Sequence, residues 1–540
     1  MQKVTMDRHV YGNDNDNVND GSDSSFRKKS KRLSRTLIRR ISSFAESPHE
    51  TPERWSLLLC VAISAFLANE IYLQKQLTKS PITFGQLPAG SFIEKIYRKM
   101  TVDKDDGNKC TSNILSRSIR PSLFVGTRGM ISSTMAYLKG GPFSTSKKGY
   151  TRFREYLDMS QDGARISVDW EFARSGEGED DVLQSEIACS KQEILEGVIR
   201  NPVVIILHGI NNDSSFGYMQ SLSRAFCNRG YISASMNFRG CGGVKLNTPR
   251  GYNGAYTGDL RSLVRQISAR VKEGTPIFLV GNSLGANIMT KYLGEEGITN
   301  TLPSCISGAA GLGNPLSIDS GTIKFPFNVL MALGVKKICF ENLKSFYSMK
   351  DSNSKAMLRK ALLSPTIANM DNSAAPGFIR NDTHYPYGTK IGYESGKEYW
   401  FEASSYRYIQ HISIPFLNLI AQNDFLVHKP SRNKLGFCLS NPNVMHVETR
   451  CGGHLGWQET SPDRTFGVSS WADTAVSDFF HAIMSVNNEN TEKPLRKTNP
   501  VAKSKFDYPE PFTFKKEMEK ELMQVKVNSM TFTRSIDSKL

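Results

Sequence analysis

The sequence contains no C-x-x-C pair, no recognisable nucleic-acid-binding module and no internal repeat. Its nine cysteines are an odd number and are widely scattered, so we expect neither a zinc site nor a dense disulfide framework. Cys241 and Cys451 fall near candidate functional loops, and two unpaired thiols are favoured over a disulfide between them. We therefore predict a protein without a metal and without a cofactor.

Acidic residues are too few to balance the basic ones. There are 52 Asp and Glu against 68 Lys and Arg, which gives a formal net charge of +16. Much of the excess lies in residues 27–40 and in the C-terminal tail. Charge gathered outside the core predicts an anionic surface partner, and lipid headgroups are favoured over nucleic acid because no nucleic-acid module accompanies it. Residues 1–54 are polar and poor in aromatics, which predicts a disordered basic region.

Long hydrophobic runs are also scarce. The best one, from Trp55 to Leu73, covers 19 positions (73 − 55 + 1) and is interrupted by Asn69 and Glu70. About 20 apolar residues span a bilayer, so residues 55–73 are predicted as a marginal signal-anchor helix. It would make the chain a single-pass protein of the endoplasmic reticulum or another endomembrane, with a cytosolic N-terminus. Charges on both sides of the run leave that orientation open.

The rest of the chain has the pattern of an α/β protein. Val203 to Leu207 is a continuous apolar run, which is typical of a central parallel strand covered on both faces. Strand patterns then alternate with helical ones, which predicts a mostly parallel sheet with helices on both faces. We expect a connector over residues 74–114, one domain over 115–485 with a cap inserted at 315–410, and a polar tail over 486–540. The oligomeric state is left open.

The stretch from Thr275 to Asn287 carries the main chemical signal. A buried strand is followed by G-x-S-x-G, with Ser283 between Gly281 and Gly285, and then by a helical pattern. In this order the motif predicts a sharp turn that presents a serine at the carboxyl end of the sheet. A serine hydroxyl becomes a good nucleophile only when a histidine takes its proton. Ser283 is the candidate nucleophile.

Two further candidates follow later strands. Asp424 comes after the strand pattern at 416–421. His454 comes after the pattern at 444–448 and is directly preceded by two glycines and followed by Leu455. The chain order Ser, Asp, His is that of α/β-hydrolases rather than of the two protease types. We expect His454 to relay the proton and Asp424 to orient the imidazole, with Asp319 as the alternative acid.

An acyl-transfer intermediate also needs amide donors. The backbone N–H groups of Leu284 and Ile210 are predicted to form this oxyanion hole. His208 is expected to shape the loop. His208 to Asp213 also spells H-x-x-x-x-D, a pattern seen in glycerolipid acyltransferases, and a chance match is favoured.

Several motifs together resemble the α/β-hydrolase superfamily, within it the membrane-anchored lipid esterases related to embryogenesis-associated protein and the YheT hydrolases. The resemblance covers about residues 115–485. Its motifs are Asp162-Gly163, His208-Gly209, 237–243, 281–286, 291–297 and 452–456. It implies the α/β-hydrolase fold and hydrolysis, and sometimes synthesis, of medium-chain acyl esters, monoacylglycerols or phospholipids. An N-terminal membrane anchor is also common in the eukaryotic members of this group.

The sequence thus predicts a serine hydrolase acting on a lipid ester through an acyl-serine intermediate. Transfer of the acyl group to an alcohol, using the same three residues, is the first alternative. A non-catalytic membrane scaffold is the second.

Overall fold

A computed structural model of the chain describes residues 52–85, 87–102, 112–138, 149–173, 190–377, 393–427, 434–460 and 468–489. The predicted basic region up to residue 51 and the tail from residue 490 lie outside these residues. The chain divides into two compact units, Met1–Ile71 and Tyr72–Leu540. The site discussed below belongs entirely to the second unit.

The predicted anchor falls on helix α2 (Pro52–Leu77). In the described part of the chain, no helix combines the length and the apolar content that a membrane crossing needs. The single-pass anchor predicted over residues 55–73 is therefore not supported by the structure. The polar pair Asn69 and Glu70 interrupts its apolar run near one end.

A nine-stranded sheet forms the centre of the second unit, in the order β1-β9-β8-β7-β6-β4-β5-β3-β2. Its strands are β1 (Ile82–Phe84), β2 (Tyr150–Asp158), β3 (Arg165–Ala173), β4 (Val203–Leu207), β5 (Ile232–Asn237), β6 (Ile277–Asn282), β7 (Ile306–Leu312), β8 (Phe416–Ala421) and β9 (Val444–Thr449). Neighbours from β9 to β5 pair in parallel, while β1, β2 and β3 pair antiparallel at the two edges. A second sheet pairs β10 (Gln458–Thr460) with β11 (Val468–Ser470). The mostly parallel sheet expected from the sequence is confirmed. The edge strand β1 was not predicted; it lies within residues 74–114, for which the sequence predicts a connector.

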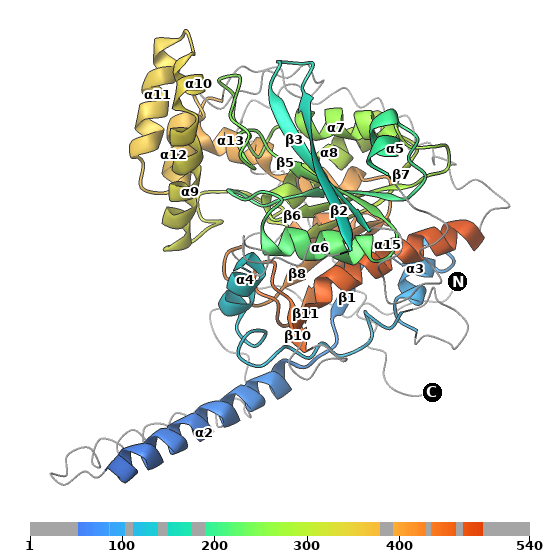
Figure 1. Cartoon of the computed structure of the whole chain (residues 1–540), viewed down its shortest axis with the longest axis vertical. Helices are drawn as coiled ribbons and strands as arrows, with labels where there is room; N and C mark the ends of the chain where they lie inside the picture. The colour runs from blue at the N-terminus through green and yellow to red at the C-terminus, as the bar shows by residue number, and fades with distance from the viewer. Residues whose placement is uncertain are drawn as a thin grey trace, which may run out of the picture. The chain divides into compact units, whose positions relative to one another are not determined.

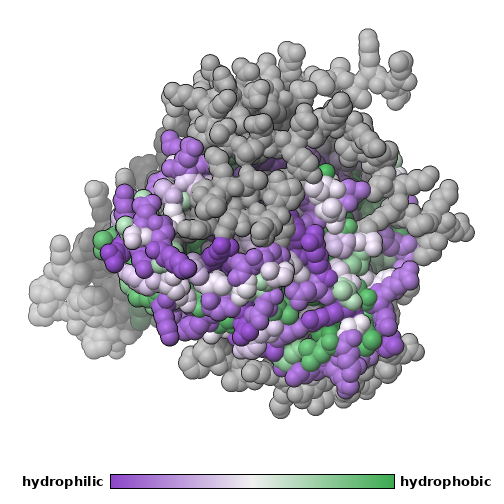
Figure 2. Space-filling model, turned by 90° about the horizontal axis from the view of Figure 1, so that it is seen from above, coloured by the Kyte–Doolittle hydropathy of each residue, from purple (hydrophilic) through white to green (hydrophobic). Residues whose placement is uncertain are grey.

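Helices cover both faces of this sheet (Figure 1). One face packs on α3 (Phe92–Lys99), α4 (Gly129–Leu138), α6 (Gly217–Cys227) and α15 (Trp471–Glu489). The other packs on α5 (Lys191–Glu196), α7 (Gly258–Ser268), α8 (Leu284–Thr299) and α14 (Leu435–Leu439). Successive side chains of a strand point to opposite faces, so β4 contributes Val204 and Ile206 to one core and Ile205 and Leu207 to the other. This explains why β4 is apolar throughout. The described part of the face shown in Figure 2 is mostly hydrophilic, with hydrophobic residues in small separate groups.

A helical segment is inserted between β7 and β8. It holds α9 (Phe327–Glu341), α10 (Leu343–Tyr347), α11 (Ser352–Leu363), α12 (Ile367–Ala374), α13 (Gly396–Ala403) and the short 3₁₀ turns η1 (Ser405–Arg407) and η2 (Ile409–His411). These elements fall at the residues where the cap was predicted. Two smaller apolar clusters form around them, one at Trp400 and one at Phe346.

Candidate active site

Ser283 lies in the sharp turn between β6 and α8. Its φ of 53° and ψ of −117° are a conformation that L-residues rarely adopt. The flanking glycines are required by close packing. A Cβ on Gly281 would lie 2.4 Å from Cα of Ala286, and one on Gly285 would lie 2.5 Å from the carbonyl oxygen of His208. The turn therefore brings the start of α8 against the strand before it and against the 208–212 loop.

The three residues predicted from chain order lie together. His454 Nε2 is 2.8 Å from Ser283 Oγ, and His454 Nδ1 is 2.8 Å from Asp424 Oδ2. All three side chains are buried. Burial alone would raise the pKa of Asp424, but the imidazole of His454 and the amide donors of its own loop hold it below its usual value. An ionised Asp424 accepts a hydrogen bond from Nδ1–H of His454, which leaves Nε2 unprotonated and facing the serine hydroxyl.

Helix α4, far away in the sequence, supports the backbone of His454. The backbone N–H of His454 donates to Ser133 Oγ of α4 at 2.7 Å, and Ser133 in turn donates to the carbonyl oxygen of Gly129 at 2.8 Å. The preceding Gly453 N–H donates to Asn423 Oδ1 at 2.8 Å. Sequence reasoning missed Ser133 and Asn423, and no local signal identifies Ser133 because 321 residues separate it from His454.

The predicted oxyanion loop follows β4 and is held by two tyrosines. The Gly209 N–H donates to the Tyr218 hydroxyl at 2.9 Å, and the Asn211 N–H donates to the Tyr252 hydroxyl at 3.1 Å. The amide between them, that of Ile210, has no hydrogen-bond partner among the described residues, nor has the amide of Leu284 at the first turn of α8. A Cβ on Gly209 would lie 3.3 Å from the Cβ of Ser283, so loop and nucleophile are in contact. The N–H groups of Ile210 and Leu284 are thus available to bind an oxyanion beside Ser283.

The alternative residues considered from the sequence have other partners. His208 is fully buried, accepts the Phe238 N–H on Nε2 at 3.1 Å and lies 2.7 Å from the Gly209 carbonyl through Nδ1. Burial lowers the pKa of His208 to about 4, so it is neutral and shapes the loop. Asp213 caps Ser215 in its own turn rather than pairing with His208. Asp319 Oδ1 accepts the Gly321 N–H at 2.7 Å, while His454 bonds to Asp424.

The inserted helices reach the loops around Ser283. The Asn211 side chain donates to the Met331 carbonyl of α9 at 2.9 Å, and the ring of Phe327 packs on that of Phe425, next to Asp424, with centroids 4.8 Å apart. Apolar side chains therefore cover part of the approach to the three residues. Exclusion of water from such a site strengthens every electrostatic interaction in it.

Nothing in the described ranges suggests a metal centre. No group of three or more His, Cys, Asp or Glu side chains is arranged there to hold an ion. Cys241 and Cys451, which were weighed as a pair, are both buried free thiols, as favoured from the sequence.

The sheet order, the strained serine turn and the positions of Asp424 and His454 after later parallel strands define an α/β-hydrolase fold. Residues 200–360 match the model of the serine aminopeptidase family S33. The chain is 28% identical over 405 residues to the embryogenesis-associated protein EMB8 of Picea glauca, covering 73% of this chain and 78% of that one. It is 28% identical over 317 residues to the monoacylglycerol lipase of Saccharomyces cerevisiae, covering 56% and 65%. It is 26% identical over 349 residues to the phospholipase ABHD3 of Mus musculus, covering 64% and 76%. The chain therefore has an α/β-hydrolase fold and is similar to embryogenesis-associated protein, a monoacylglycerol lipase and a phospholipase.

Proposed function

We propose that this chain is a carboxylic ester hydrolase that cleaves medium-chain acyl esters of lipids through an acyl-Ser283 intermediate. The observation that supports it most directly is the unbroken hydrogen-bond chain from Ser283 through His454 to Asp424. The lipid class is suggested by relatives described as a monoacylglycerol lipase and a phospholipase.

In the proposed reaction, Ser283 Oγ attacks the ester carbonyl while His454 Nε2 takes its proton. The N–H groups of Leu284 and Ile210 stabilise the oxyanion of the tetrahedral intermediate. Asp424 keeps the proton of the neutral ring on Nδ1 and stabilises the imidazolium that forms. As the C–O bond breaks, His454 returns the proton to the leaving alcohol. A water molecule, activated by the same imidazole, then attacks the acyl-serine and releases the fatty acid.

The proposal is tested by labelling with a fluorophosphonate and by hydrolysis of a monoacylglycerol with a medium-length chain. Ser283→Ala should abolish labelling and reduce kcat by at least about 10⁴-fold, because the nucleophile is gone. Ser215→Ala is the matched control, since its exposed hydroxyl bonds only within the neighbouring turn and should leave both readouts unchanged. Labelling that persists in Ser283→Ala would reject Ser283 as the reactive residue.

Acyl transfer uses the same acyl-serine and differs only in the acceptor. Adding ethanol or glycerol to the assay separates the two outcomes. A fatty acid as the main product supports hydrolysis, whereas an ester as the main product at low alcohol concentration would replace the hydrolase with a transferase.

A further inference from the structure

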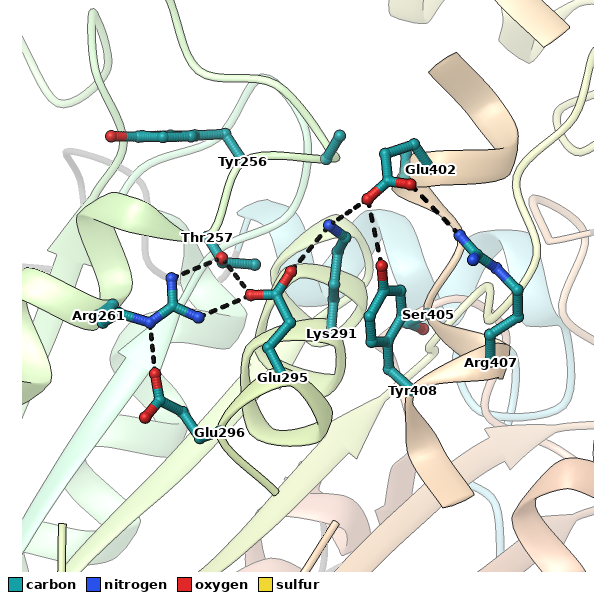
Figure 3. Close-up of polar contacts among 12 residues, drawn as sticks. Tyr256, Thr257, Arg261, Lys291, Glu295, Glu296, Glu402, Ser405, Arg407 and Tyr408 are labelled. Atoms are coloured by element: carbon teal, nitrogen blue, oxygen red, sulfur yellow. Dashed lines mark hydrogen bonds and ion pairs between the residues drawn. The ribbon is translucent and has the colours of Figure 1, made fainter. Parts of the chain in front are cut away.

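A cluster of charged side chains lies between the helix that follows Ser283 and the end of the inserted segment (Figure 3). It contains three basic and three acidic residues, Arg261, Lys291, Arg407, Glu295, Glu296 and Glu402. Their side chains are between 2% and 11% exposed. Removal of one member leaves its partner as an unpaired charge in the interior, which is strongly unfavourable. We call this group the charged cluster.

One end of the charged cluster joins α8 to α7. Glu295 accepts from Lys291 Nζ at 2.9 Å, from Arg261 Nη2 at 2.7 Å and from the Thr257 hydroxyl at 2.6 Å. Arg261 also donates to Glu296 through Nε. Burial alone would lower the pKa of Lys291, but Glu295 and Glu402 raise it well above its usual value, so this lysine is a fixed cation. This end of the cluster holds two helices of the sheet domain together.

The other end joins α8 to α13, the last α-helix of the inserted segment. Lys291 Nζ donates to Glu402 Oε1 at 2.9 Å, and the Tyr408 hydroxyl donates to the same oxygen at 3.2 Å. One turn earlier on α8, the Asn287 amide donates to the Ala403 carbonyl at 2.6 Å and accepts the Ser405 N–H at 3.1 Å. Asn287 and Lys291 are four residues apart and therefore lie on the same face of α8, which bonds to the end of α13.

Helix α13 in turn lies next to the residue that follows the nucleophile. The Gly254 N–H donates to the Tyr399 hydroxyl at 3.0 Å. A Cβ on Gly254 would lie 3.3 Å from Leu284 Cδ1, 3.4 Å from Tyr399 Oη and 3.5 Å from the Cβ of Ala403. The side chain of Leu284 and the α13 residues Tyr399 and Ala403 thus all lie against Gly254. The wall of the site beside Leu284 depends on where α13 sits.

We infer that Lys291 and Glu402 are positioning residues that fix α13 against the nucleophile helix and thereby shape the part of the site that receives the acyl chain. This inference rests on the proposed hydrolase function. Neither residue contacts Ser283, His454 or Asp424 directly, so the nucleophile should keep its reactivity when the pair is broken. A displaced wall affects an acyl chain long enough to touch it and spares a short one.

The chain offers a matched pair of variants. Glu402→Gln weakens the ion pair that holds α13, whereas Glu296→Gln breaks a buried ion pair on the α7 side of the same cluster. For Glu402→Gln we expect KM for the decanoyl p-nitrophenyl ester to rise about 10-fold, with kcat and the butyryl ester little changed, because a lost contact to the chain weakens ground-state and transition-state binding alike. Fluorophosphonate labelling of Ser283 should stay within about twofold of wild type. Amide hydrogen exchange in α13 should accelerate in Glu402→Gln and not in Glu296→Gln.

A milder variant, Tyr408→Phe, removes one hydroxyl that bonds Glu402 and should shift the same readouts in the same direction even if Glu402→Gln does not fold. The inference is overturned if Glu296→Gln changes the decanoyl-to-butyryl ratio as much as the α13-side variants do, or if those variants leave the ratio unchanged. Hydrogen exchange does not depend on activity. A wild type without esterase activity but with the expected exchange pattern would reject the proposed function and keep the positioning role of the pair.

Discussion

Replacing Asp424 with asparagine tests the proposed relay most sharply, because the loop around the carboxylate dictates which way an amide must face. Asp424 Oδ1 accepts the N–H groups of Leu426 at 2.9 Å and Val427 at 3.0 Å, and Oδ2 faces His454 Nδ1 at 2.8 Å. In Asp424→Asn the amide oxygen should keep the two N–H donors. The NH₂ group then faces the imidazole.

A donor facing Nδ1 reverses the tautomer of the ring. The proton moves to Nε2, which points at Ser283 Oγ, and His454 no longer accepts the serine proton. The expected loss in kcat is about 10⁴-fold, equivalent to about 5 kcal/mol in activation free energy. Stability should change little because every backbone donor of the loop stays satisfied. Steady-state kinetics on a short p-nitrophenyl ester, with thermal melting of the same samples, measures both quantities.

Asp319→Asn is the control, since Asp319 was the alternative acid and bonds Gly321 within its own turn. It should keep wild-type kcat. If Asp424→Asn retains kcat within about 10-fold of wild type, or if Asp319→Asn loses as much, the assignment of the orienting acid is refuted.

Two further predictions concern packing and pH. Gly285→Ala places a Cβ 2.5 Å from the His208 carbonyl oxygen, so it should destabilise the fold by about 1–3 kcal/mol and slow fluorophosphonate labelling. The control is Gly251→Ala, whose new Cβ would have its nearest neighbour 3.6 Å away. This control should change neither the melting temperature nor the labelling rate. Burial raises the pKa of Asp371 to about 7, only partly offset by the indole N–H of Trp400 at 2.9 Å. The folded state therefore holds a proton that the unfolded chain releases near pH 4, so stability falls as pH rises from about 4 to 7. Asp371→Asn removes this slope, and its melting temperature should exceed that of wild type by more at pH 8 than at pH 5; an equal or reversed difference would contradict the reasoning.

The positions of the central strands in the chain were predictable from the sequence because parallel strands buried on both faces are apolar throughout. The runs at 203–207 and 416–421 coincide with β4 and β8. The residues proposed for catalysis were found for a related reason. Ser283, Asp424 and His454 each follow a strand, and carboxyl ends of parallel strands meet at one edge of the sheet.

What escaped prediction depends on contacts between distant segments. Tyr218 and Tyr252 satisfy neighbouring amides of one loop, yet each lies within an ordinary aromatic or helical pattern. Lys291 and Glu402 are charged residues that any pattern would assign to solvent, and only the assembled structure brings them together at 2.9 Å. The membrane anchor predicted over residues 55–73 is not supported in the described part of the chain, where no helix is long and apolar enough to cross a membrane.

The bond from His454 to Ser133 has a practical consequence for dissecting this enzyme into pieces. A fragment that begins at β2 would contain all three proposed catalytic side chains, yet the backbone of the imidazole-bearing loop would have lost the hydroxyl on which it rests. A fragment limited to residues 200–360, the part matched by the family model, would lack Asp424 and His454 altogether. Minimal active versions of this hydrolase should therefore retain the stretch from residue 112 to residue 138, although it precedes every parallel strand of the sheet.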